Sequence, residues 1–422
     1  MKRSKKRRIN YFRVMIALLI LLLVIFGIYK IISKIVNREP KKVLMIDIVN
    51  KDIGVVKGLL NDYKLDINYL YEYSDNIVKD KVISQSIDAL TELEDNDKLD
   101  VVVSLGKLDK EQLKKDGINE LGNVPIMMYH GIKNLKNSET SYTGGNVDKD
   151  GYTRTVEAFR SDLEFYYEKG YRMIKLSDYI NGKIDVPYGK SPIILTFDDG
   201  NDNNIKVTGL DSDGNIIIDE NSAVGVLEAF KKKYPDYNVT AIFFITNALF
   251  NQPEYNEKIL DWLVNNGYEI GNHTKGHNNL SKTTTSETQE VIGSMYQKLE
   301  SLMGNNYQKI VALPFGSPYN KTHENYKYVL SGEYNGKKYE TEAALRVGWE
   351  PEVSPFNKDF DKTFLKRCRA YDNNGVDFDI TMVFKMLDTK RYISDGNVNR
   401  IVINNKDKDI LGDSKLEVVT YE

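Results

Sequence analysis

Two segments of this sequence hold side chains that could bind a metal ion or transfer protons. The first is Thr196–Gly200, in which Asp198 and Asp199 directly follow an apolar run. Two adjacent carboxylates at the end of a buried strand are unfavourable unless they bind a metal or take part in proton transfer. A solvated turn with Gly200 as its hinge is the alternative explanation.

The second segment, His273–His277, places two histidines four residues apart. The chain has only four histidines, so a chance pair in one loop is a weak explanation. Neutral imidazole nitrogens suit a divalent ion whose ligand set a carboxylate completes. This is not the helical H-E-x-x-H zinc motif, because Gly276 interrupts the segment and no glutamate follows His273.

A separate histidine, His130, ends the apolar segment 124–130, where a purely structural role is the alternative. Together the segments supply two carboxylates, two neighbouring imidazoles and one distant imidazole. Metal-assisted hydrolysis of an amide needs three ligands with an open position for water, a base and an acid. The remaining histidine, His323, follows no clear strand and is expected at the surface.

Predicted strands precede these three segments and must position them. The expected strands cover 124–129, 193–197, 239–245, 268–271 and 310–313, and the expected helices cover 156–169, 223–233, 256–266 and 286–303. Hairpin turns are expected at Asp213-Gly214 and Asn335-Gly336. In parallel α/β barrels the carboxyl ends of the strands form the active-site face, so the three segments should meet there.

Residues 41–120 read as a separate small α/β module. Strands are expected at 43–49, 67–71 and 99–105, with helices at 53–60 and 77–93. This alternation predicts a parallel sheet. The module contains no catalytic pattern, and we interpret it as a spacer or interaction module.

The N-terminus reads as a signal anchor. Residues 14–36 form an apolar run long enough for a transmembrane helix, and seven basic residues in 1–13 precede it. The positive-inside rule places this basic tail in the cytoplasm and the rest of the chain outside the cell membrane. A cleaved signal peptide is the alternative, but no small-residue cleavage site follows the run.

Charge is divided unevenly along the chain. Residues 1–42 carry 12 Lys or Arg and one acidic residue, and the remaining residues carry 46 basic and 60 acidic side chains. A basic tail on an acidic body argues against nucleic acid as a partner. Cys368 is the only cysteine, which excludes an intramolecular disulfide and a cysteine metal cluster.

The motifs resemble those of the polysaccharide deacetylases, carbohydrate esterase family four. Thr196–Gly200 is similar to their first motif, His273–His277 to their second, and Ala312–Gly316 to their third, which usually ends in Pro-Tyr-Gly. The strand that ends in His130 resembles the circularly permuted branch that includes poly-N-acetylglucosamine deacetylases. The resemblance covers about residues 124–320.

The resemblance implies roles for individual residues. Asp199, His273 and His277 would hold one divalent metal, generally zinc, although other divalent ions serve in this family. Asp198 would be the general base, and His130 would be the acid that protonates the leaving amine.

Further roles concern the oxyanion and the sugar. The backbone N–H of Phe315 would help to stabilise the oxyanion, and this donor survives the replacement of tyrosine by phenylalanine. Trp349 and Tyr129 are candidates for substrate binding, because flat aromatic faces match the C–H surfaces of sugars. Most of the 28 tyrosines are explained as ordinary core and surface residues.

One departure from the family pattern is larger. The arginine that often precedes the third motif, and orients the base in relatives, is replaced by Ala312-Leu313. Arg346, Arg367 and Arg369 are the candidates to replace it.

The implied fold is an α/β, distorted (β/α) barrel of about seven strands over 121–422, after the transmembrane helix and the small module. The implied function is N-deacetylation of N-acetylglucosamine in an extracellular polysaccharide, with cell-wall peptidoglycan as the leading substrate. Secreted poly-N-acetylglucosamine is the alternative polymer, and an O-deacetylase or a non-catalytic carbohydrate-binding protein also fits the pattern.

Overall fold

The computed structural model describes residues 26, 30 and 43–422. The predicted tail over 1–13 lies outside the described residues, as does the predicted transmembrane helix over 14–36 apart from Phe26 and Lys30. Within the described part of the chain, no helix is long and apolar enough to cross a membrane.

Residues 43–47 and 87–97 form a small unit of their own. Its strands β1 (Val43–Leu44) and β4 (Glu92–Leu93) pair antiparallel. The strand predicted over 43–49 is therefore correct only in its first two residues.

The module's larger sheet has the order β2-β5-β3, with β2–β5 parallel and β3–β5 antiparallel. Its elements are α2 (Ile53–Leu60), β2 (Asp66–Glu72), β3 (Val82–Gln85) and β5 (Lys98–Ser104). The helix predicted over 77–93 is wrong. Asp80 and Leu90 have positive φ angles that an α-helix cannot contain, and Val82 is fully buried beside β5.

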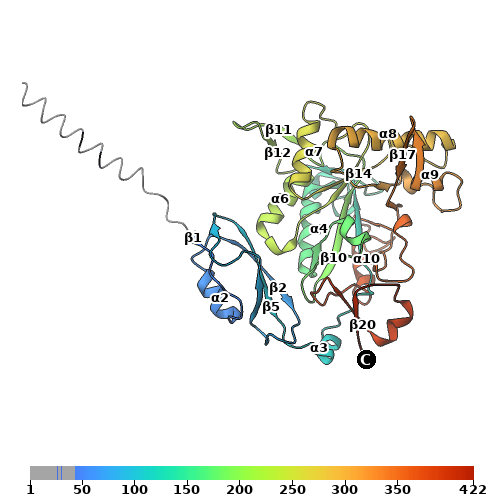
Figure 1. The fold of residues 1–422 in the computed structure, drawn as a ribbon. Coiled ribbons are helices and arrows are strands. Elements are labelled where there is room, and N and C mark those ends of the chain that lie inside the picture. Colours follow the sequence, from blue (N-terminus) through green and yellow to red (C-terminus); the bar gives the residue numbers. More distant parts are fainter. Residues whose placement is uncertain (1–25, 27–29, 31–42) are drawn as a thin grey trace, which may run out of the picture. The chain divides into compact units, whose positions relative to one another are not determined.

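The main sheet follows the order β18-β15-β14-β13-β10-β6-β19, and every pair along this path is parallel (Figure 1). Its strands are β6 (Ile126–Tyr129), β10 (Ser191–Phe197), β13 (Ile242–Ile245), β14 (Glu269–Asn272), β15 (Ile310–Ala312), β18 (Ala343–Leu345) and β19 (Cys368–Arg369), with β9 (Tyr171–Met173) beside β10. The two ends of the path approach each other, because Leu345 of β18 bridges to Leu365, just before β19. The sheet is thus a curled, partly closed barrel.

Helices and hairpins connect these strands. The helices are α3 (Lys110–Lys115), α4 (Val156–Glu168), α5 (Leu176–Ile180), α6 (Ala223–Lys233), α7 (Asn256–Asn265), α8 (Thr285–Met303), α9 (Tyr326–Leu330) and α10 (Ile380–Leu387). The paired short strands are β7 (Ile132–Lys133) with β8 (Arg154–Thr155), β11 (Val207–Leu210) with β12 (Ile216–Ile218), β16 (Ser331–Tyr334) with β17 (Lys337–Glu340), and β20 (Arg400–Asn404) with β21 (Glu417–Tyr421). The predicted helices of the barrel and both predicted hairpins are confirmed.

The two faces of the sheet have separate cores. In β10, Ile193, Leu195 and Phe197 pack in one apolar cluster with α4, α6 and α7, whereas Ile194 belongs to a second cluster. Alternate side chains of a strand point to opposite faces. Burying each of these large side chains contributes about 1.5–3 kcal/mol to folding. This alternation decides which residues near the strand ends can reach the site.

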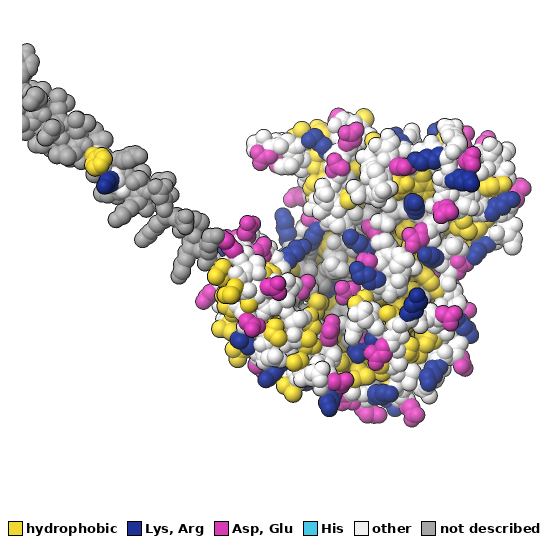
Figure 2. Space-filling model, in the orientation of Figure 1, with side chains coloured by type: hydrophobic (Ala, Val, Ile, Leu, Met, Phe, Trp, Pro, Cys, Tyr) yellow, Lys and Arg dark blue, Asp and Glu magenta, His cyan; other side chains and the backbone are white. Residues whose placement is uncertain are grey.

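Acidic and basic side chains are interspersed on the described surface that Figure 2 shows. Such a mixture is typical of a folded protein in water and does not by itself mark a binding face.

Candidate active site

The chemically capable residues lie at the carboxyl ends of neighbouring strands. His130 follows β6, Asp198 and Asp199 follow β10, and His273 follows β14. β6 pairs with β10, β10 with β13, and β13 with β14. Parallel pairing places these ends on one edge of the sheet, as the sequence led us to expect.

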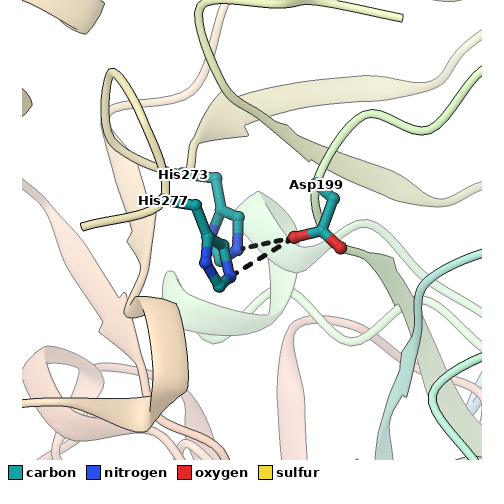
Figure 3. A group of neighbouring side chains, drawn as sticks. All are labelled: Asp199, His273 and His277. Atoms are coloured by element: carbon teal, nitrogen blue, oxygen red, sulfur yellow. Dashed lines mark ion pairs between the residues drawn. The ribbon is translucent and has the colours of Figure 1, made fainter. Parts of the chain in front are cut away.

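Asp199, His273 and His277 converge on one point (Figure 3). The Oδ1 atom of Asp199 lies 3.3 Å from Nε2 of His273 and 3.4 Å from Nε2 of His277, and the possible ligand atoms lie within 4.8 Å of one another. The His273 side chain is 1% exposed, and the other two are about one-third exposed. The cluster is thus anchored on its inner side and open on its outer side.

The loops that carry these residues have unusual backbone conformations. Asp199, Thr274 and His277 all have positive φ angles, which non-glycine residues rarely adopt. Asn272 stabilises the histidine loop: its Oδ1 accepts from the N–H of Thr274 at 2.8 Å, and its Nδ2 donates to the carbonyl of Ile292 in α8 at 3.1 Å. The surrounding fold therefore holds a strained loop in place.

Several features of the three residues fit a divalent ion. The Nδ1 atom of His273 lies 2.9 Å from the carbonyl oxygen of Ala312 and donates to it, which leaves Nε2 of the neutral ring as a free acceptor. Nε2 of His273 and Oδ1 of Asp199 are both buried, and neither has a hydrogen-bond partner among the described residues. One carboxylate and two imidazoles with converging ligand atoms match a zinc-type donor set.

Asp198 is held by an arginine from the far end of the chain. The guanidinium of Arg367 donates to both carboxylate oxygens at 2.7 Å, and it also donates to Oγ1 of Thr196 at 3.1 Å. Burial alone would raise the pKa of Asp198, but the charge of the Arg367 guanidinium outweighs burial and lowers it well below its usual value. Asp198 is therefore a buried carboxylate that remains ionised.

Arg367 takes the place of the arginine that is missing before the third motif. Of the three candidates, Arg346 donates to the carbonyl of Val347 and Arg369 to that of Asp150. Only Arg367 binds Asp198, and its side chain is fully buried. The sequence could not distinguish the three, because the choice depends on which strand closes the sheet beside β6.

His130 lies beside Asp198. Its Nε2 is 4.0 Å from Oδ2 of Asp198, and its side chain is 15% exposed. Burial lowers the pKa of His130 despite the nearby carboxylates. The carbonyl of His130 accepts a hydrogen bond from Nδ2 of Asn204 at 2.6 Å, which ties the end of β6 to the loop after β10.

Phe315 lies at the exposed edge of the ligand cluster. Its ring centroid is 4.5 Å from that of His277, its side chain is 53% exposed, and its φ angle is positive. Trp349 is also exposed, and its ring centroid lies 6.4 Å from that of Phe378. His323 is partly exposed and accepts a hydrogen bond from the N–H of Asn325.

Tyr129 does not have the position that substrate binding requires. It is 1% exposed, and its hydroxyl lies 2.9 Å from that of Tyr166 and donates to Asp162 of α4 at 3.2 Å. Tyr129 has the same strand parity as Met127, so it faces the helices and not the site. The expected sugar contact at Tyr129 is therefore corrected to a core position.

Sequence comparison finds known deacetylases that are similar to part of this chain. The polysaccharide deacetylase profile matches residues 185–329, a range that includes the two carboxylates and both cluster histidines but neither His130 nor Arg367. A PASTA domain profile matches residues 43–105. A peptidoglycan-N-acetylglucosamine deacetylase of Bacillus cereus is 31% identical over 130 residues, which cover 31% of this chain and only 38% of that protein.

Solved structures of deacetylases resemble the chain at low sequence identity. Deacetylase PplD of Streptococcus pyogenes, in complex with acetate, has a TM-score of 0.43 and 16% identity, covering 60% of this chain and 94% of its own. IcaB from Ammonifex degensii has a TM-score of 0.37 and 17% identity, covering 59% and 92%. The family profile and the curated relative thus show similarity to polysaccharide deacetylases over about a third of the chain.

Proposed function

We propose that this protein is a metal-dependent N-deacetylase that acts on N-acetylglucosamine residues of cell-wall peptidoglycan. One observation carries the proposal: an ionised, arginine-bound carboxylate, Asp198, lies directly beside the converging ligand atoms of Asp199, His273 and His277. A binding protein has no use for a buried base next to three converging metal-ligand side chains, so hydrolysis explains the arrangement better than carbohydrate binding alone.

The three ligand residues would hold one divalent ion, with zinc as the first candidate. Such an ion would supply Lewis acidity, which polarises an acetyl carbonyl and makes a water molecule more acidic. Asp199 and His273 lie at the ends of different strands, and His277 lies in the loop beyond. The acetyl group would lie on the open side of the cluster, where Asp199 and His277 are about one-third exposed.

The other residues would move protons. Asp198 would take a proton from the attacking water, since it remains ionised and Arg367 fixes its orientation. His130, in its protonated form, would give a proton to the sugar nitrogen as the C–N bond breaks, and the electron pair of that bond would stay on nitrogen. The backbone N–H of Phe315 would donate to the oxyanion that develops on the acetyl carbonyl.

Two features favour peptidoglycan as the polymer. Residues 43–105 match the PASTA profile, a domain type associated with cell-wall binding, and the curated relative is named for peptidoglycan deacetylation. The apolar run over 14–36, with its basic tail, would keep the enzyme anchored in the cell membrane next to the wall. A secreted poly-N-acetylglucosamine is the second candidate, because the strand that carries His130 precedes the Asp198 strand in the chain.

Mass spectrometry of muropeptides tests this proposal. Cells that express the wild-type protein should contain more glucosamine without acetyl groups in peptidoglycan than cells that lack it. Asp198→Asn should reduce turnover of the purified protein by about 10²–10⁴-fold with its metal content retained. Asp202→Asn is the matched control, since Asp202 is half-exposed and pairs with Lys206 at the surface, and it should behave as wild type. Unchanged peptidoglycan with altered acetylation of an exopolysaccharide would favour the second polymer.

A further inference from the structure

The imidazole of His130 has few polar restraints. Its Nε2 is 4.0 Å from Asp198, too far for a hydrogen bond, and its buried Nδ1 has no hydrogen-bond partner in the described part of the chain. Histidines that transfer protons are usually oriented by a hydrogen bond to the second ring nitrogen. Something other than a hydrogen bond must therefore hold this ring.

An aromatic ring supplies the missing contact. The centroid of Tyr152 lies 4.8 Å from that of His130, and the two planes meet at 65°, an edge-to-face arrangement. Edge-to-face pairs are favourable because the positive edge of one ring meets the negative face of the other. Tyr152 is 37% exposed, so it lies at the boundary between His130 and solvent.

The backbone around Tyr152 is itself firmly held. The carboxylate of Asp148 accepts hydrogen bonds from the N–H groups of Asp150, Tyr152 and Thr153, at 3.1, 3.1 and 2.7 Å. Gly151 has a φ of +67°, and a Cβ there would lie 2.4 Å from Cβ of Tyr371. The turn thus has one conformation in which it fits against its neighbour.

Two arginines fix this segment on either side of the turn. The guanidinium of Arg369 lies 5.9 Å from the Tyr152 ring and 4.1 Å from the Tyr371 ring, and it donates to the carbonyl of Asp150 at 3.2 Å. After the turn, the buried Arg154 binds both oxygens of Asp162 in α4. Tyr152 is therefore presented to His130 from a rigid support.

We propose that Tyr152 is a positioning residue that orients the imidazole of His130 for proton donation to the leaving amine. The role rests on the proposed function and acts through His130, without contact to the reacting atoms. The ring performs this role and the hydroxyl does not, because the contact to His130 is between rings. Phenylalanine at position 152 should therefore still orient His130, and a residue without a ring should not.

A double-mutant cycle on the full chain tests the proposal. Acetate release from N-acetylglucosamine pentasaccharide is measured for wild type, Tyr152→Ala, Tyr152→Phe, His130→Ala and the Tyr152→Ala/His130→Ala double variant. Tyr152→Ala should lower kcat by about 10–100-fold with little change in KM, and Tyr152→Phe should stay near wild type. The double variant should be no slower than His130→Ala, since a positioning residue has nothing left to position.

A control variant separates this inference from damage to the fold, and the activity of the wild type separates it from failure of the proposed function. Tyr142→Ala removes another exposed tyrosine of the same segment and should match wild type in turnover, metal content and thermal midpoint. An inactive wild type would overturn the proposed function. Equal losses in Tyr152→Phe and Tyr152→Ala, or additive losses in the double variant, would overturn only the role of Tyr152.

A readout without turnover completes the test. The chain has four histidines, so nitrogen NMR of the metal-loaded protein, solubilised in detergent and labelled at histidine, gives few ring signals. The His130 signals, assigned with His130→Ala, should be those of one ordered ring in wild type and Tyr152→Phe. In Tyr152→Ala these signals should broaden, or shift toward the values of a ring that averages several orientations. An unchanged His130 spectrum in Tyr152→Ala would contradict the proposal.

Discussion

The Asp198 carboxylate and the Arg367 guanidinium are both almost completely buried, and they bind each other through two parallel hydrogen bonds. Such a pair gives geometric precision more than net stability, because the removal of both charges from water offsets much of their attraction. Its value here is orientation: the base cannot rotate, and its charge is maintained next to the ligand cluster.

Replacing Arg367 by lysine should preserve the charge but remove the fork that binds both carboxylate oxygens. We expect Arg367→Lys to retain metal, to lose some stability and to fall at least about tenfold in kcat, because the base becomes less well oriented. Arg172→Lys is the matched control: Arg172 also binds a carboxylate, that of Asp236, but from β9. Steady-state kinetics and metal analysis of both variants measure the difference, and wild-type kcat in Arg367→Lys would show that orientation of the base is unimportant.

At the scale of elements, the turn that follows β10 packs closely against the backbone at Leu249. Gly200 has a φ of +68°, and a Cβ at this position would lie 2.3 Å from the carbonyl oxygen of Leu249. Only glycine allows the chain to leave β10 so closely packed. The turn thereby fixes the direction in which the preceding residue, Asp199, points toward the histidines.

Gly200→Ala should therefore shift the turn and weaken metal binding. The positive φ alone costs about 1–3 kcal/mol, and the clash with Leu249 adds to it. Gly214→Ala is the matched control, since Gly214 has a φ of +83° but no atom within 4 Å of the added Cβ. Thermal unfolding and metal titration compare the two. Tight metal binding by Gly200→Ala would mean that the turn does not position Asp199.

The sequence predicted most of the barrel because its strands and helices have clear apolar periods. α6 (Ala223–Lys233) has the predicted bounds, and β10 and α8 differ by one or two residues. The stretch over 77–93 failed because its apolar spacing fits a helix, whereas its backbone contains left-handed residues. Tyr129 points to the helix-covered face of its strand and therefore lies in the core. The arginine partner of Asp198 depends on the order of the strands in the sheet, which a local sequence pattern does not contain.

At the scale of the whole molecule, the charge asymmetry and the apolar run over 14–36 predict an external enzyme with a cytoplasmic N-terminus. Protease added to intact cells stripped of their wall should digest residues 41–422, whereas a cytoplasmic marker protein should survive until lysis. Immunoblotting against the C-terminal region measures this. Complete protection of the chain would place the enzyme inside the cell and contradict the peptidoglycan proposal.

The separation between Asp198 and Arg367 also bears on biosynthesis. The two residues are 169 positions apart, and the strand that follows Arg367 pairs with β6 from the beginning of the barrel. When a chain emerges N-terminus first from a ribosome or an export channel, Asp198 emerges long before Arg367. Until residue 367 arrives, Asp198 must stay hydrated, because an unpaired buried charge would cost several kcal/mol. Assembly of the site is thus coupled to synthesis of residue 367, and a chain that terminates before this residue cannot form the Asp198–Arg367 pair.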